Sequence, residues 1–118
     1  MMTAEALRTK QCVSQRNALP AAKVAELLAL LDGWQQDDQS IVRTFSFTDY
    51  VATLAFVNAI APMIHEQDHH PELTITYNRC VVRYNTHSVN DGKGGLSDND
   101  FICAARIDAI VHATHQVR

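Results

Sequence analysis

The stretch ELTITYNRCVVRYNTH, residues 72–87, decides the fold class. It is rich in β-branched residues, which favour extended strands. Asn78 and Arg79 are the predicted turn, although this pair is a weaker turn signal than Asn-Gly. A two-residue turn at this point pairs Tyr77 with Cys80. The stretch therefore predicts a β-hairpin.

Two further strands are expected upstream of this hairpin. In SIVRTFSF, residues 40–47, Ile41 and Phe45 lie on one side of an extended chain and Val42 lies on the other. This period of two is typical of a strand. The stretch WQQDD, residues 34–38, precedes it and completes a second predicted hairpin.

The first and last of three predicted helices have recognisable ends. LPAAKVAELLALLDGW, residues 19–34, has an apolar face and Gly33 at the position of a C-terminal cap. LSDNDFICAARIDAIVHATH, residues 96–115, begins with Ser97 and Asp100 at the spacing of a capping box. Both segments are therefore predicted to be helical.

The middle helix is predicted over SFTDYVATLAFVNAIAPMIHEQ, residues 46–67. Ser46 and Asp49 again have the spacing of a capping box. Pro62 lacks a backbone N–H, so a bend or a fresh short turn is expected before His65. One face of this helix collects five residues: Val51, Leu54, Ala55, Asn58 and Ala61.

The predicted order of elements is α-β-β-α-β-β-α. Hairpins separated by helices indicate an α+β fold with a four-stranded antiparallel sheet and helices packed on one face. Residues 1–18 are polar and aperiodic and are expected to form a loose N-terminal arm. Residues 19–118 are expected to form a single domain.

The composition excludes several classes of partner. The chain has 118 residues, of which 47% are apolar and 19% are charged, and its formal net charge is −3. A chain of this length buries enough surface to fold without a metal or a disulfide. It has no basic run, which argues against nucleic acid or an anionic membrane as its partner. It also has no apolar run long enough for a membrane span.

The cysteines and the first residues indicate a cytoplasmic protein. Cys12, Cys80 and Cys103 are an odd number without C-x-x-C spacing, so reduced thiols are the simplest interpretation. The first seventeen residues lack the apolar core of a secretory signal.

The stretch HEQDHHP, residues 65–71, contains the H-E-x-x-H pattern of zinc hydrolases. That pattern requires His65 and His69 to share one helical face. Pro71 lies two residues beyond His69, and prolines disfavour helix just before them, so His69 is expected at or beyond the helix end. A third ligand, His87 or a carboxylate, stays open, but the context disfavours the zinc interpretation.

The second hairpin brings histidines together in another way. Extending its predicted register places His70 opposite His87, with His69 beside them, at the end of a sheet next to a glycine-rich loop. Histidine gives and takes protons near neutral pH. A pair of histidines therefore suits a reaction in which one proton leaves and another arrives.

Several separated points of the sequence agree with one family. They are His69-His70-Pro71, Tyr77, Thr86-His87, Gly94-Gly95-Leu96 and Asp100. In spacing and residue type they resemble the pterin-4a-carbinolamine dehydratases, and the resemblance spans residues 19–110. Four features depart from the family pattern and are expected to alter substrate fit or rate: Pro62, His65, Leu73 and a longer loop over residues 88–95.

The resemblance implies dehydration of 4a-hydroxytetrahydropterin to quinonoid dihydropterin and water, without a metal or a cofactor. It implies His69 and His87 as the acid and the base, in an order that the sequence leaves open, and His70 as a group that positions the pterin. Four residues flank the histidines as expected pocket walls: Asp68, Asn85, Thr86 and Ser88. Pro71 and Asp100 are expected to have structural or loop-positioning roles, Asp100 mainly as the capping partner of Ser97.

The resemblance also implies partners. It links the protein to an aromatic amino acid hydroxylase in tetrahydrobiopterin recycling, and to a homodimer or homotetramer built through sheet edges and helices. Three alternatives stay open: a non-catalytic dimerisation or transcription-coactivator-type module, a zinc hydrolase that uses His65 and His69, and an altered relative that acts on another pterin.

Overall fold

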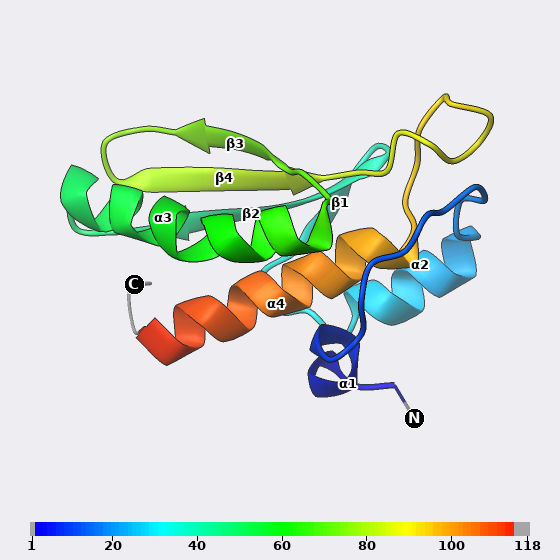
Figure 1. Cartoon of the computed structure of the whole chain (residues 1–118), viewed down its shortest axis with the longest axis horizontal. Coiled ribbons are helices and arrows are strands. Elements are labelled where there is room, and N and C mark those ends of the chain that lie inside the picture. Colours follow the sequence, from blue (N-terminus) through cyan, green and yellow to red (C-terminus); the bar gives the residue numbers. More distant parts are fainter. Residues whose placement is uncertain (1, 115–118) are drawn as a thin grey trace.

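The computed structural model describes residues 2–114, which form one antiparallel sheet and four helices (Figure 1). Strands pair in the order β1-β2-β4-β3. The elements in chain order are α1 (Ala4–Arg8), α2 (Ala21–Leu28), β1 (Gln35–Asp37), β2 (Ser40–Ser46), α3 (Tyr50–Gln67), β3 (Glu72–Ile75), β4 (Arg79–Tyr84) and α4 (Asp98–Thr114). The predicted α+β class and both hairpins are confirmed. His115, at the end of the last predicted helix, lies outside the described residues.

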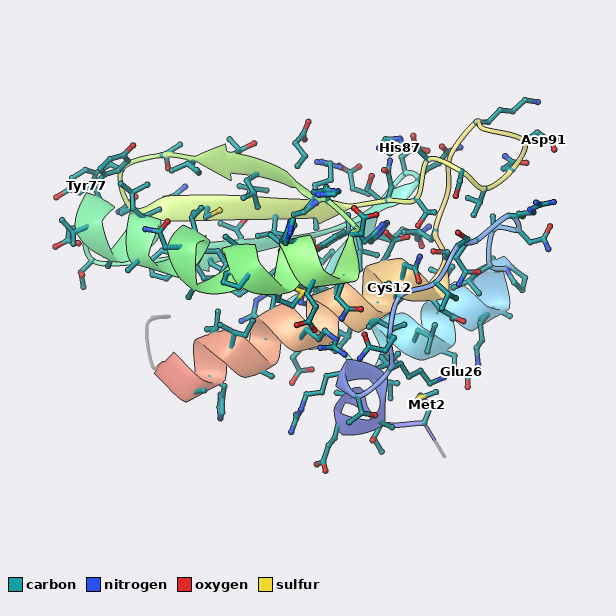
Figure 2. The ribbon with its side chains drawn as sticks, viewed as in Figure 1. Met2, Cys12, Glu26, Tyr77, His87 and Asp91 are labelled. Atoms are coloured by element: carbon teal, nitrogen blue, oxygen red, sulfur yellow. The ribbon has the colours of Figure 1, made fainter. Side chains whose placement is uncertain are left out.

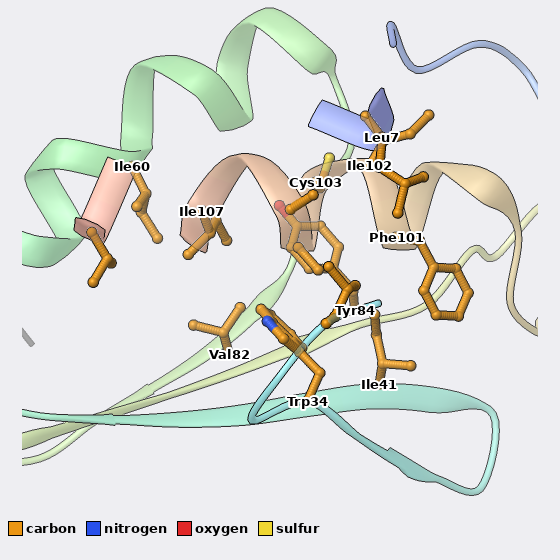
Figure 3. Packing of buried hydrophobic residues seen from close by; sticks show 14 of the residues in the cluster. Leu7, Trp34, Ile41, Ile60, Val82, Tyr84, Phe101, Ile102, Cys103 and Ile107 are labelled. Atoms are coloured by element: carbon orange, nitrogen blue, oxygen red, sulfur yellow. The ribbon is translucent and has the colours of Figure 1, made fainter. Parts of the chain in front are cut away.

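The core lies between the sheet and the helices, which all lie on one side of it (Figure 1). Side chains of β2 and β4 face those of α4 across this layer (Figure 3). Alternate residues of the strands, such as Ile41, Phe45 and Val82, are fully buried. The predicted period of two in β2 thus marks its buried side.

The predicted register of the β3–β4 hairpin is wrong. Thr76 N donates to Arg79 O at 2.9 Å, so the turn residues are Tyr77 and Asn78. Ile75 pairs with Cys80. A turn at Asn78 and Arg79 would instead pair Ile75 with Val82, two residues further along β4. Because side chains alternate with a period of two, this error preserves the faces of both strands. The start of β3 and the end of β4 still lie together at one end of the sheet.

Helix α3 ends at Gln67 as predicted but differs from its prediction at its N-terminus and at Pro62. Asp49 is the N-cap, because its side chain accepts a bond from Ala52 N at 2.8 Å, while Ser46 is the last residue of β2. The helix continues through Pro62 to Gln67 without a fresh turn. The carbonyl that Pro62 leaves without a donor belongs to Asn58, which is exposed and open to water.

The apolar face that the sequence indicates on α3 is not the buried one. Val51 is 77% exposed, and Ala55 and Asn58 are also exposed. The side chains that α3 buries are Thr53, Phe56, Ile60, Met63 and Gln67.

Residues before α2 pack more closely than the expected loose arm. Thr3 caps α1, and Leu7 is 1% exposed in the core. Arg106 of α4 donates to Lys10 O at 2.7 Å. The division of the chain into an arm over residues 1–18 and a domain over residues 19–118 stays a prediction. In residues 2–114 no helix is long and apolar enough to cross a membrane.

Candidate active site

A pocket of about 530 Å³ lies at the end of the sheet where α3 and β4 end and where β3 and α4 begin. This volume is in the range of small-molecule sites. Figure 2 shows Cys12 and His87 at this end of the molecule. The lining residues come from four separate segments: Cys12, Val13, Ser14, Gln15, Gln67, Asp68, His69, His70, Asn85, Thr86, His87, Ser88 and Asn99. All three predicted histidines therefore reach one cavity.

His69 is the most firmly held of the three histidines. Asp68 ends α3 in a left-handed conformation, with φ of 51°, and turns the chain away from the helix axis. His69 Nε2 lies 2.6 Å from Asp100 Oδ1. Its ring also stacks on Tyr84, with 5.2 Å between centroids and 18° between planes. The ring orientation is thus fixed by a carboxylate and by an aromatic face.

Asp100 joins the start of α4 to this histidine. Its Oδ2 accepts bonds from Ser97 N and from Thr86 Oγ1, both at 2.9 Å. Ser97 Oγ lies 2.7 Å from Thr86 Oγ1 and accepts a bond from Asn99 N at 3.3 Å. The bond from Ser97 N to Asp100 is that of the predicted capping box, whereas the Ser97 hydroxyl caps Asn99 N in place of Asp100 N. Asp100 is fully buried and does more than cap the helix, because its second oxygen bonds His69.

His70 and His87 are more open than His69. Both are exposed at the rim of the pocket, and Thr86, between Asn85 and His87, is buried. Thr86 pairs with Gly95 through two backbone bonds of 2.8 and 3.1 Å, which close the loop over residues 88–95. The exposed imidazoles can therefore meet a ligand from the solvent side.

One wall of the pocket escaped the sequence analysis. Residues 12–15 run along it in a conformation fixed by side chains of α3 and α4. Cys12 N donates to Gln67 Oε1 at 2.8 Å. Asn99 makes two bonds to the backbone of Val13, accepting from its N at 3.1 Å and donating to its O at 2.7 Å. Ser88 Oγ donates to Gln15 O at 2.7 Å, which links this wall to the predicted pocket residues.

The two histidines of the H-E-x-x-H pattern do not share a helical face in this fold. His65 is exposed on α3 and does not line the pocket, whereas His69 lies beyond the helix end. In residues 2–114 no group of three or more His, Cys, Asp or Glu side chains is arranged to hold a metal ion.

Comparison with solved structures gives the class of this fold. A structure described as a transcriptional coactivator/pterin dehydratase from Brucella melitensis matches with a TM-score of 0.72 and 35% identity, over 80% of this chain and 98% of that one. A pterin dehydratase-like protein described as a RuBisCO assembly factor shares the fold, with a TM-score of 0.52 and 23% identity over 65% of this chain and 84% of that one. The architecture is that of the pterin dehydratases.

Sequence comparison gives the family. The family model described as pterin 4 alpha carbinolamine dehydratase matches residues 17–110. A protein of Bdellovibrio bacteriovorus, provisionally named a pterin-4-alpha-carbinolamine dehydratase, is 50% identical over 93% of this chain and 92% of its own. A similarly named protein of Nitrosospira multiformis is 46% identical over 92% of this chain and 95% of its own. The chain belongs to the pterin-4-alpha-carbinolamine dehydratase family.

Proposed function

We propose that this protein dehydrates 4a-hydroxytetrahydropterin to quinonoid dihydropterin and water. In this reaction the N5–H bond breaks, its electron pair forms the C4a=N5 double bond, and the C4a hydroxyl leaves with an added proton as water. No electron acceptor is needed. The observation that carries the proposal is the convergence of His69, His70 and His87 on one pocket, with His69 bound to Asp100.

His69 and His87 together are the proposed acid and base. A neutral His69 that donates from Nε2 to Asp100 keeps Nδ1 as its proton-accepting nitrogen. His87 is exposed at the rim and can exchange protons with solvent between turnovers. Each well-placed acid or base contributes about 10²–10⁴-fold to such a rate.

The remaining pocket residues are proposed to hold the pterin. His70, Asp68, Asn85 and Ser88 offer donors and acceptors around the cavity. Thr86 is engaged with Asp100 and Ser97, so its proposed contribution is to fix the carboxylate that orients His69. Pro71 carries the chain from His70 into β3.

The experiment is dehydration of freshly prepared 4a-hydroxytetrahydropterin, followed by stopped-flow absorbance at neutral pH with and without a chelator. We expect acceleration that survives chelation and falls by about 10²-fold or more in His69→Gln and in His87→Ala. His65→Gln is the matched control and should retain the wild-type rate. Dehydration activity that is lost on chelation or in His65→Gln would instead support a zinc site at the H-E-x-x-H pattern. A folded protein without activity would overturn the dehydratase.

We further propose a role in tetrahydrobiopterin recycling beside an aromatic amino acid hydroxylase, as a homodimer or homotetramer. Strand β3 is an outer strand of the sheet and is largely exposed, so it offers unpaired backbone groups to a second copy. Light scattering after size exclusion would test the assembly, and a strict monomer would contradict it.

A coactivator-type binding role is the second candidate. The description of the Brucella melitensis structure favours it, as do four exposed apolar side chains on α3 and around the β3–β4 turn: Tyr50, Val51, Ile75 and Tyr77. If this role exists, His69→Gln should abolish dehydration and leave partner binding intact, whereas Val51→Asp should do the reverse.

A further inference from the structure

Two cysteines meet at the wall of the pocket. Cys12 Sγ lies 3.5 Å from Cys103 Sγ, although 91 positions separate them in the chain. Cys12 belongs to the pocket wall over residues 12–15, and Cys103 belongs to α4, three residues after Asp100. The bond that Cys12 N donates to Gln67 and the two bonds between Val13 and Asn99 hold the wall in place. The contact between the sulfur atoms is therefore built into the fold.

The two thiols have opposite chemical character. Cys12 is partly exposed and lines the pocket, whereas Cys103 is fully buried. The hydrogen bond with Cys103 lowers the pKa of Cys12 against the opposing effects of burial and of the Asp100 carboxylate, and the charge of Arg106 lowers it further. The same contact and burial raise the pKa of Cys103, so Cys103 keeps its proton. An accessible thiol of lowered pKa, 3.5 Å from a buried and protonated thiol, is the arrangement of an attacking and a resolving cysteine.

We propose that Cys12 and Cys103 form a hydroperoxide-responsive dithiol in the wall of the pterin pocket. The Cys12 thiolate attacks the distal oxygen of a hydroperoxide, the O–O bond breaks, and an alcohol or water leaves after taking up a proton. Cys12 becomes a sulfenic acid. Cys103 sulfur then displaces that hydroxyl as water and forms the disulfide, with its own proton completing the water. An external dithiol restores both thiols by exchange.

The disulfide would displace the pocket wall that contains Cys12. The sulfur atoms must approach from 3.5 Å to about 2.05 Å, which draws Cys12 toward α4 and away from its present place in the wall. Cys103 shares α4 with Asp100 and Asn99, which bind His69 and Val13. We expect oxidation to lower dehydration severalfold. That consequence rests on the proposed function, whereas formation of the disulfide does not.

The test exposes the full-length protein to hydrogen peroxide with a chelator present, then alkylates it under denaturing conditions. The reduced chain has three free cysteines and should take up three alkyl groups. The oxidised chain should be lighter by about 2 Da before alkylation, take up a single alkyl group, and yield one peptide that links Cys12 to Cys103. Dithiothreitol should reverse the change.

Two matched variants complete the test. Cys80 is fully buried, and burial raises its pKa to about 11, so Cys80→Ser should leave the link unaffected. Cys12→Ser should abolish it. Unchanged alkylation, a Cys12 sulfinic acid without the link, or a link between two chains would each overturn the proposal. A link that forms in a protein without dehydratase activity would uphold the dithiol and refute the proposed function instead.

Discussion

His69 Nε2 and Asp100 Oδ1 are 2.6 Å apart, and this bond joins the end of one helix to the start of another. The side chain of His69 is 13% exposed and that of Asp100 is completely buried. A buried carboxylate needs partners to offset its lost hydration, and Asp100 has them in His69, Thr86 and Ser97 N. The capping of α4 and the orientation of His69 therefore depend on the same carboxylate.

Replacement of Asp100 by asparagine should separate these two roles. The amide oxygen can still accept the bond from Ser97 N, but it no longer offers two anionic oxygens to His69 and Thr86 together. We expect kcat for dehydration to fall by about 10²-fold with a smaller change in KM. Asp98→Asn, two residues earlier in the first turn of α4 and without a bond to His69, is the control. Equal kcat in the two variants would contradict a positioning role for Asp100.

The N-cap of α3 gives a stability prediction. Asp49 bonds Ala52 N, so Asp49→Ala should lower the free energy of unfolding by about 1 kcal/mol. Ser46→Ala should change it much less, since Ser46 ends β2 and does not cap the helix. Urea denaturation followed by circular dichroism would measure both. A larger loss in Ser46→Ala would favour the capping box that the sequence alone indicated.

Local sequence patterns predicted the elements of this fold well. The alternation in residues 40–47, the β-branched run in residues 72–87 and the capping box at Ser97 each act over a few neighbouring residues. Each predicted element appears in the structure, although the helix predicted over residues 19–34 ends early, at Leu28, and helix α1 was not predicted. The turn shifted from Asn78-Arg79 to Tyr77-Asn78, because neither pair has a strong intrinsic preference for a hairpin turn.

Contacts between distant segments were beyond the reach of the same reasoning. The bond between Asn99 and Val13 and the contact between Cys12 and Cys103 join residues far apart in the chain. Neither contact has a periodic signature. The three histidines were found because a family pattern links them, whereas Gln67, Tyr84 and the wall over residues 12–15 have no such signal.

Cys80 gives a prediction for alkaline pH. Burial raises its pKa from 9.0 to about 11, so between these values the unfolded chain releases a proton that the folded chain keeps. The folded state then binds more protons, and stability falls as pH rises through this window. Cys80→Ala should reduce the slope of the free energy of unfolding against pH by at most about 1.4 kcal/mol per pH unit. Urea midpoints between pH 8.5 and 11 would measure it, and an unchanged slope would show that Cys80 does not titrate as described.

Asn99 gives the last prediction, because it holds the pocket wall through two bonds to Val13. Asn99→Ala removes both bonds and should release residues 12–15, at a cost of about 1–3 kcal/mol in stability. We expect faster hydrogen exchange at the Val13 amide and a raised KM for the pterin, with kcat less affected because His69 and Asp100 keep their bond. Asn58→Ala, on the exposed face of α3, is the matched control. Exchange at Val13 that equals the wild-type rate would mean that the wall is held by other contacts, such as the bond between Cys12 N and Gln67.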